Sequence, residues 1–260
     1  MKIKRILLGL IFLHSFSYAM DAFEIVTKVD TRDDGDNIVS NMSMVLIDKT
    51  NKQRVRSMRT FTKDFGVDTY RTIYFLAPSD VKNTAFLTFD YDDDNKDDDQ
   101  WLYLPALKKT KRIASTDKSG SFMGSDFSYA DLTKPDLTDY HYKIIKQQKV
   151  GEYNTWIIER IPKSEEILKE TGYKKSYLFV REDNFVVIRA MHYLDDGKKK
   201  YMSVKKLEKI EGIWIATEIE MKTTKNKKRL HTTILKFNDV KLNQNLNENL
   251  FSVRQIEKGL

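Results

Sequence analysis

The most informative absence in this sequence is cysteine, which occurs nowhere among the 260 residues. Without cysteine the chain has no disulfide, no thiolate metal site and no cysteine to carry a lipid. Proline and glycine are also scarce, with 4 and 10 residues, and no Gly/Ser-rich linker or internal repeat divides the chain. Length alone allows one large β domain or two small domains, and the missing linker favours a single domain.

Long hydrophobic runs are missing as well. The apolar stretch at residues 6–12 is too short to span a bilayer. Three basic residues precede it, and Ser17 and Ala19 follow at the −3 and −1 positions of a cleavage site. This pattern predicts a cleaved secretory signal peptide over residues 1–19, with a retained N-terminal anchor as the less favoured alternative. Residues 20–260 are then expected to form one exported domain, located in the periplasm or secreted.

Basic residues slightly outnumber acidic residues. The formal charge of +7 falls to +4 once the three basic residues of the predicted signal are removed. Lysine-rich stretches occur at residues 108–112, 198–200 and 225–229, but none comes with a stacking platform for nucleic acid. These stretches fit solvated strand ends, or alternatively a contact with anionic lipid headgroups or an acidic partner. We expect no nucleic-acid partner and at most transient membrane contact.

The apolar pattern has a helical period at first and a period of two afterwards. Residues 21–32 place Phe23, Val26 and Val29 on one helical face behind the N-cap residue Asp21. From residue 37 onwards the alternation leaves one wet face, which is typical of antiparallel strands. A short helix is predicted over residues 164–171. The predicted strands cover residues 37–48, 53–62, 72–76, 84–91, 100–104, 142–149, 155–161, 176–181, 185–194, 201–209, 213–222 and 230–240.

These elements predict a mainly β (α+β) fold. About eleven strands would form a strongly curved antiparallel sheet or incomplete β-barrel, with helices covering its concave face. A sheet too open to be filled by its own side chains leaves an apolar hollow. For each inward residue, lining such a hollow competes with simple core packing. The predicted inward strand residues are Met42, Met44, Leu46, Phe61, Trp101, Tyr103, Trp156, Ile158, Ile215, Ile219, Leu235 and Phe237.

Motifs for enzyme or metal chemistry are absent. The acidic run at residues 90–99 lacks the glycine and glutamate that a helix-loop-helix calcium site needs, and it fits a solvated hairpin tip. His141, His192 and His231 are isolated, and no histidine pair shows the spacing of a zinc protease. No serine sits in a nucleophile elbow. We therefore predict no catalytic residue, no metal, no cofactor and no enzyme activity.

The glycine-punctuated stretch at residues 118–132 reads KSGSFMGSDFSYADL. It lacks the Gly-Lys-Ser/Thr that grips nucleotide phosphates, which excludes a nucleotide site. Two alternatives stay open for its apolar side chains Phe122, Met123 and Phe127. They pack onto the core, or they form a flexible gate over an apolar cavity.

Three features carry a family resemblance. Residues 101–105 read Trp-Leu-Tyr-Leu-Pro, the predicted signal is followed directly by an amphipathic helix, and residues 249–253 read Asn-Leu-Phe-Ser-Val. Together with the long segment 103–132, they resemble the LolA/LolB-like superfamily, in its branch of outer membrane lipoprotein-sorting proteins. The resemblance covers essentially the whole mature chain.

The resemblance implies an incomplete barrel that holds acyl chains under a helical lid. It also implies that the protein shuttles lipid or lipidated protein across the periplasm, with an RND-type inner-membrane transporter as a partner. The greater length, the acidic hairpin and the loop at 118–132 depart from the carriers proper and leave lipoprotein cargo open. No motif marks the carriers' lid arginine, although alternation places Arg59 inward as a candidate.

We therefore predict a periplasmic carrier of lipid or lipidated protein. One alternative is a binding module that senses envelope lipids or lipoproteins without transporting them. A secreted hydrolase is the third hypothesis, and it requires a polar cleft with convergent titratable groups.

Overall fold

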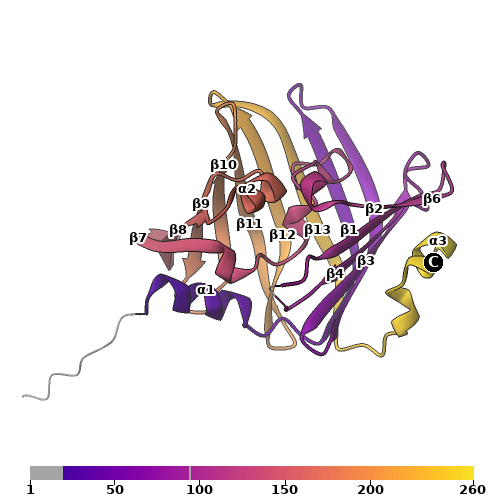
Figure 1. Ribbon diagram of the computed structural model, residues 1–260, viewed down its shortest axis with the longest axis horizontal. Coiled ribbons are helices and arrows are strands. Elements are labelled where there is room, and N and C mark those ends of the chain that lie inside the picture. The colour runs from indigo at the N-terminus through magenta and orange to yellow at the C-terminus, as the bar shows by residue number, and fades with distance from the viewer. Residues whose placement is uncertain (1–19, 94) are drawn as a thin grey trace, which may run out of the picture.

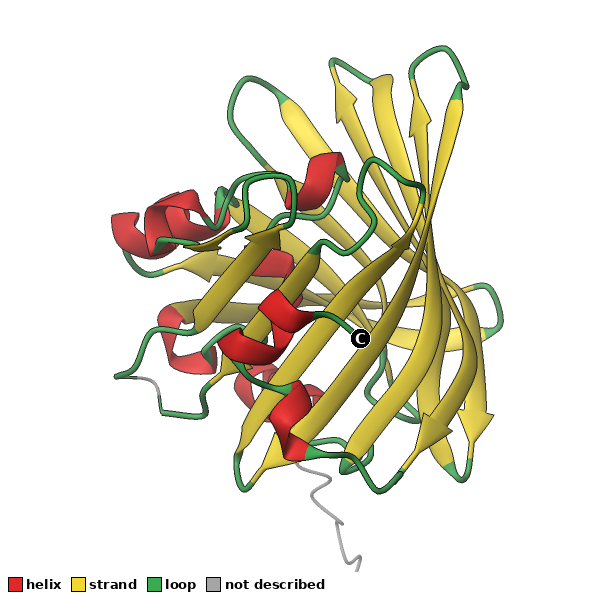
Figure 2. Ribbon diagram, turned by 90° about the vertical axis from the view of Figure 1, so that its right-hand side faces the viewer, coloured by secondary structure: helices red, strands yellow, loops and turns green. Residues whose placement is uncertain are grey.

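The computed structural model describes residues 20–93 and 95–260, so the predicted signal peptide lies outside the described residues. Its strands form one antiparallel sheet in the order β6-β5-β4-β3-β2-β1-β13-β12-β11-β10-β9-β8-β7 (Figure 1). The first and last strands pair in the middle of this order, whereas β6 and β7 form its two ends. The sheet twists and curls without closing (Figure 2). This confirms the predicted mainly β class and incomplete barrel.

The sheet has 13 strands, where about eleven were predicted. No predicted range covers the edge strand β6, because its sequence Lys-Thr-Lys-Arg is polar throughout and shows no alternation. The strands are β1 (Asn37–Asp48), β2 (Gln53–Phe65), β3 (Asp68–Ala77), β4 (Ala85–Asp90), β5 (Asp99–Leu104), β6 (Lys109–Arg112), β7 (Tyr140–Val150), β8 (Tyr153–Pro162), β9 (Lys175–Arg181), β10 (Val187–Tyr193), β11 (Lys198–Ile210), β12 (Ile213–Lys225) and β13 (Lys228–Leu242).

Helix α1 (Ala22–Asp30) confirms the first predicted helix. Asp21 and Glu24 form a capping box, in which each side chain accepts a hydrogen bond from the other's backbone N–H at 2.8–2.9 Å. The apolar face of α1 buries Ile25 and Val26 against the end of the sheet formed by β7, β8 and β9. The helix therefore covers one part of the sheet's inner surface, as predicted.

The second predicted helix is α2 (Glu165–Thr171). The Ser164 hydroxyl caps its first turn, and Gly172 ends it in the left-handed conformation at φ 72°. A further helix, α3 (Val253–Lys258), begins after the N-cap residue Ser252. No predicted helix was placed at these residues.

The two faces of the sheet can be told apart by what covers them. We call the inner face the one that carries Met42, Met44 and Leu46 and contacts the segment between β6 and β7. That segment lies within the curve of the sheet (Figure 1). The opposite, outer face is covered near β4 and β5 by α3, which inserts Ile256 and follows directly after Phe251.

Three predicted inward residues are corrected by this arrangement. Phe61, Trp101 and Tyr103 pack on the outer face, in the cluster that contains α3. For Trp101 and Tyr103 the cause is that β4 and β5 are covered on both faces, so that apolar side chains point both ways and alternation cannot choose between them. In β2, Met58 packs in the inner cluster, so Phe61, three residues later, faces outward. Trp101 faces outward with Leu87, whereas Leu102 packs in the inner cluster.

Arg59 also lies on the outer face. Its guanidinium donates to the Asn41 side chain at 2.6 Å and lies over the Phe61 ring. It is therefore not an inward-facing arginine.

Candidate ligand-binding hollow

The inner face divides into two halves with different coverings. The filled half comprises the inner face of β1 to β6 and β13, and it is packed by the loop between β6 and β7. Phe122 is 1% exposed, and its ring centre lies 5.0 Å from that of Phe86 and 6.2 Å from that of Phe75. The loop side chains were predicted either to pack onto the core or to form a flexible gate, and Phe122 packs onto the core.

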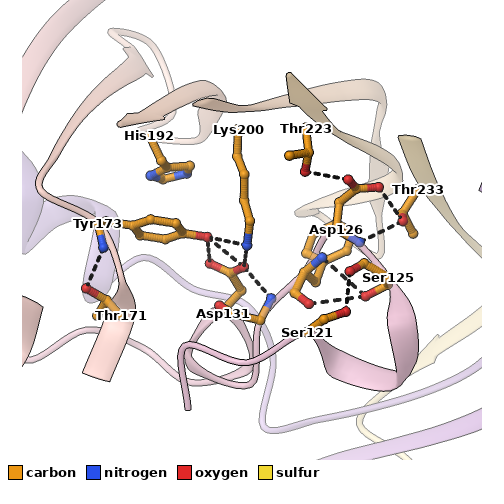
Figure 3. A network of polar contacts seen from close by, with 12 residues as sticks. Ser121, Ser125, Asp126, Asp131, Thr171, Tyr173, His192, Lys200, Thr223 and Thr233 are labelled. Atoms are coloured by element: carbon orange, nitrogen blue, oxygen red, sulfur yellow. Dashed lines mark hydrogen bonds and ion pairs between the residues drawn. The ribbon is translucent and has the colours of Figure 1, made fainter. Parts of the chain in front are cut away.

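A polar latch holds this loop to the sheet. The backbone N–H of Asp126 donates to the Thr233 hydroxyl at 2.9 Å, and that hydroxyl donates to the Asp126 carboxylate at 2.7 Å. Thr223 donates to the other carboxylate oxygen (Figure 3). His231 Nδ1 lies 2.6 Å from the carboxylate. The Asp126 side chain thereby ties the loop to β12 and β13.

The hollow half comprises the inner face of β7 to β12, which is roofed by α1. A cavity of about 430 Å³ remains there, within the range of about 300–1,000 Å³ typical of small-molecule sites. Its apolar wall includes Val26 and Val29 from α1 and Phe127 from the loop. The strands contribute Leu178, Val187, Ala190, Met202, Val204, Ala216, Ile219 and Met221.

The predicted cavity residues are distributed over both halves. Phe127 and Ile219 line the hollow. Trp156 and Ile158 pack beneath α1 on the same half. Ile215 lies in a separate cluster with Ile213 and Leu242. The filled half takes Met42, Met44, Leu46, Phe122, Met123, Leu235 and Phe237.

A buried polar network forms one edge of the hollow (Figure 3). Tyr173 donates its hydroxyl proton to the Asp131 carboxylate at 2.9 Å, and Lys200 donates to the Tyr173 oxygen at 3.1 Å. The Lys200 ammonium also lies 3.7 Å from Asp131. His192 stacks on the Tyr173 ring at 4.3 Å and shares a hydrogen bond of 2.8 Å with Ser176. Each group therefore has a partner within the network.

The environment shifts the pKa of these groups in different directions. Burial opposes ionisation of Asp131, but the Lys200 ammonium and the hydrogen bonds it accepts lower its pKa below the ordinary value. Burial lowers the pKa of His192 to about 3. Burial and the neighbouring Asp131 carboxylate raise the pKa of Tyr173. At neutral pH the network is thus an Asp131–Lys200 ion pair with a neutral tyrosine and histidine.

No signal in the sequence indicated three polar residues of this half. Asp131 lies between β6 and β7, Tyr173 lies between α2 and β9, and Lys200 lies in β11, so no local motif joins them. Their contacts span 42 and 27 residues of sequence. Only the topology of the sheet brings them together.

The acidic run at residues 90–99 connects β4 to β5. Asp93 accepts hydrogen bonds from Asn95 at 3.0 Å, which closes the turn locally. Within residues 20–93 and 95–260, no three histidine, aspartate or glutamate side chains gather in a way that could hold a metal ion. In the same residues no helix is long and apolar enough to cross a membrane.

Known proteins share this architecture. A family model described as "Uncharacterized protein" matches residues 67–258, more than half of the chain. The structure of a DUF1329 family protein from Desulfovibrio piger is 29% identical, with a TM-score of 0.80 over 89% of this chain and 96% of that chain. An outer membrane lipoprotein-sorting protein domain from Vibrio parahaemolyticus is 28% identical, with a TM-score of 0.81 over 91% and 98% of the two chains. The chain belongs to the LolA-like family.

A more distant LolA-like structure shows how far the fold extends. The LolA superfamily protein from Nitrosomonas europaea is 18% identical, with a TM-score of 0.67 over 91% of this chain and 99% of that chain. At this identity the likeness shows the shared fold alone. No curated protein sequence matches the chain.

Proposed function

We propose that this LolA-like protein is a periplasmic carrier that binds a lipid or a lipidated protein in the hollow and moves it between membranes. The observation that carries the proposal is the apolar cavity of about 430 Å³ between α1 and the inner face of β7 to β12. Each methylene moved from water into such a site contributes about 0.8 kcal/mol. A tail can therefore be held there by burial alone.

Helix α1 is the removable wall in this proposal. It begins immediately after the predicted signal, and Ala22, Ile25 and Val26 contact the sheet through one face only. Displacing the helix would open the hollow along β7 to β9 without breaking a strand pair. Loading and release of a tail would then require movement of a single short helix.

The setting of the carrier follows from the family and the predicted export. The protein would work in the periplasm, contact membranes transiently, and exchange cargo with an RND-type inner-membrane transporter. Asp131, Tyr173 and Lys200 at the edge of the hollow are engaged with one another. The proposal assigns no reaction and no cofactor to the protein.

Native mass spectrometry of purified and delipidated protein tests the proposal. We expect a bound lipid after purification and uptake of lipid after stripping, followed by transfer between donor and acceptor vesicles. Ala190→Phe, which fills the hollow, should abolish uptake. The matched control Ala106→Phe, at an exposed position, should leave it unchanged.

Two outcomes would count against transport. Stripped protein that never takes up lipid would overturn the carrier proposal. Uptake without transfer between vesicles would instead support the alternative of a lipid-sensing module.

A further inference from the structure

Arg160 in β8 differs from the other basic residues that line the hollow. Arg32 donates to the backbone carbonyl of Trp214 at 3.0 Å, and the Lys134 ammonium lies 4.0 Å from the Asp30 carboxylate. By contrast, Nε of Arg160 is buried and has no hydrogen-bond partner. A buried donor is costly to leave unpaired, so this N–H is suited to bind an acceptor that enters the hollow.

A second unpartnered donor lies beside this arginine. Tyr142 in β7 is the cross-strand neighbour of Arg160, and both side chains line the hollow. The Tyr142 hydroxyl is also buried without a hydrogen-bond partner. Burial raises the pKa of Tyr142, so the hydroxyl keeps its proton and can donate it. A cation and a neutral donor therefore converge on the same end of the cavity.

The only contact found for the Arg160 guanidinium among the described residues is aromatic. Its central carbon lies 4.7 Å from the centre of the Tyr140 ring. A cation above a ring keeps its in-plane N–H groups available for another partner. This stacking orients the guanidinium without using its donors.

Three carboxylates near the hollow are engaged by groups other than Arg160. Asp131 is engaged by Lys200 and Tyr173, and Asp30 lies next to Lys134. Glu159, the neighbour of Arg160 in sequence, pairs with Lys175 at 3.4 Å. These three carboxylates therefore leave the buried Nε–H of Arg160 available to an acceptor.

The remaining wall is suited to an apolar tail. Met202, Val204 and Ile219 line the cavity from β11 and β12. Thioether and branched aliphatic side chains accept a flexible chain and offer it no hydrogen bond. The hollow thus combines an apolar body with an end that carries the unpartnered donors of Arg160 and Tyr142.

We infer that the hollow takes an amphiphile with an anionic headgroup, a carboxylate or a phosphate, which Arg160 and Tyr142 bind while an acyl tail lies along β11 and β12. This inference rests on the proposed function, since it names the chemical class of ligand for the same hollow. It assigns Arg160 a role in specificity, because an anionic headgroup is the stronger acceptor for its buried Nε–H.

Binding of tail-matched ligands to the delipidated protein tests the inference. The probes are hexadecanoate, 1-hexadecanoyl-glycerol 3-phosphate and the neutral 1-hexadecanoyl-glycerol, each titrated by displacement of a fluorescent fatty acid. We expect at least one anionic probe to bind about tenfold or more tightly than the neutral one, since hydrogen bonds to charged groups are the strong ones. Comparison of the two anionic probes distinguishes a carboxylate from a phosphate headgroup.

Arg160→Gln should remove this preference and leave the affinity for the neutral probe unchanged. Arg189→Gln is the matched control, because Arg189 is exposed on β10 and does not line the hollow. Tyr142→Phe removes one neutral donor and keeps the charge, so it should reduce the preference by a smaller factor. This variant also provides the test if Arg160→Gln does not fold.

Several results would overturn the inference. They are equal affinity of the wild-type protein for anionic and neutral probes, or an equal loss for both kinds of probe in Arg160→Gln. If none of the three probes binds, the proposed carrier function fails as well. If all three bind with equal affinity, only the inference about the headgroup fails.

Discussion

The filled and hollow halves of the inner face belong to one continuous sheet, yet they are covered in different ways. In the filled half, a loop inserts Phe122 between Phe75 and Phe86 and leaves it 1% exposed. In the hollow half, α1 contacts the sheet through Ile25 and Val26, and a cavity of about 430 Å³ remains beside it. The difference lies in the covering segment and not in the strands.

The shapes of the two coverings explain this difference. An irregular loop can direct consecutive side chains into separate gaps of a curved sheet. A helix is a cylinder about 10 Å across that buries only one stripe of side chains. Placed against a concave surface, it leaves space along its flanks. The same curvature is therefore filled by a core in one half and leaves an open cavity in the other.

The strongest test of the comparison is removal of the central side chain of the filled half. Phe122→Ala should lower the free energy of unfolding by about 3–5 kcal/mol, because the ring is fully enclosed and the cavity cannot collapse. Phe23→Ala, at a residue 48% exposed on α1, should cost about 1 kcal/mol at most. Urea denaturation measures both. A small loss in Phe122→Ala would mean that the loop is a gate and not core.

A matched pair of leucines compares the halves directly. Leu46→Ala in the filled half, where the residue is 2% exposed, should cost about 2–5 kcal/mol. Leu178→Ala should cost about 1–2 kcal/mol, since its side chain already faces the cavity and has fewer atoms to lose contact with. Urea denaturation measures the free energy of unfolding of both variants. Equal losses in Leu46→Ala and Leu178→Ala would show that the hollow is packed in solution.

The smallest expected effect concerns acid stability of the hollow half. Burial lowers the pKa of His192 to about 3, below its value of about 6.5 in the unfolded chain. The unfolded state therefore takes up the proton first. The resulting stability is fully present above pH 6.5 and is lost as pH falls from there towards 3. The expected loss between pH 7 and pH 5 is on the order of 1–2 kcal/mol.

His192→Gln should reduce the dependence of the free energy of unfolding on pH. His141→Gln, at an exposed position of β7, should leave that dependence unchanged. Unfolding at several pH values measures the slope independently of any offset that the substitution adds. An unchanged slope in His192→Gln would assign the acid sensitivity to another group.

Local signals in the sequence were enough for most elements of the fold, but not for β6 or α3. Alternation located strands such as β1, and the side chains of Asp21 and Ser164 marked two helix starts correctly. Capping and alternation act between residues close in sequence, which is why they can be recognised without a structure. The polar edge strand β6 was missed because it carries neither signal.

The site was predicted only in part. Phe127 and Ile219 line the hollow as expected, but Trp101 and Tyr103 lie on the outer face because α3 covers them. Arg160 and Tyr142 gave no signal in sequence, since an arginine and a tyrosine on strands are ordinary residues. What distinguishes them is that their unpartnered buried donors are cross-strand neighbours on the wall of the hollow.

The sequence by itself determined that this chain forms a curved antiparallel sheet with capped helices, because period-two alternation and capping depend on neighbouring residues. Only the tertiary structure decided which part of the inner face is filled and which is hollow. That choice depends on where the β6–β7 loop and α1 come to rest against strands distant in sequence. Packing and hydrogen-bond satisfaction are properties of all the atoms around a site, so no local pattern encodes them.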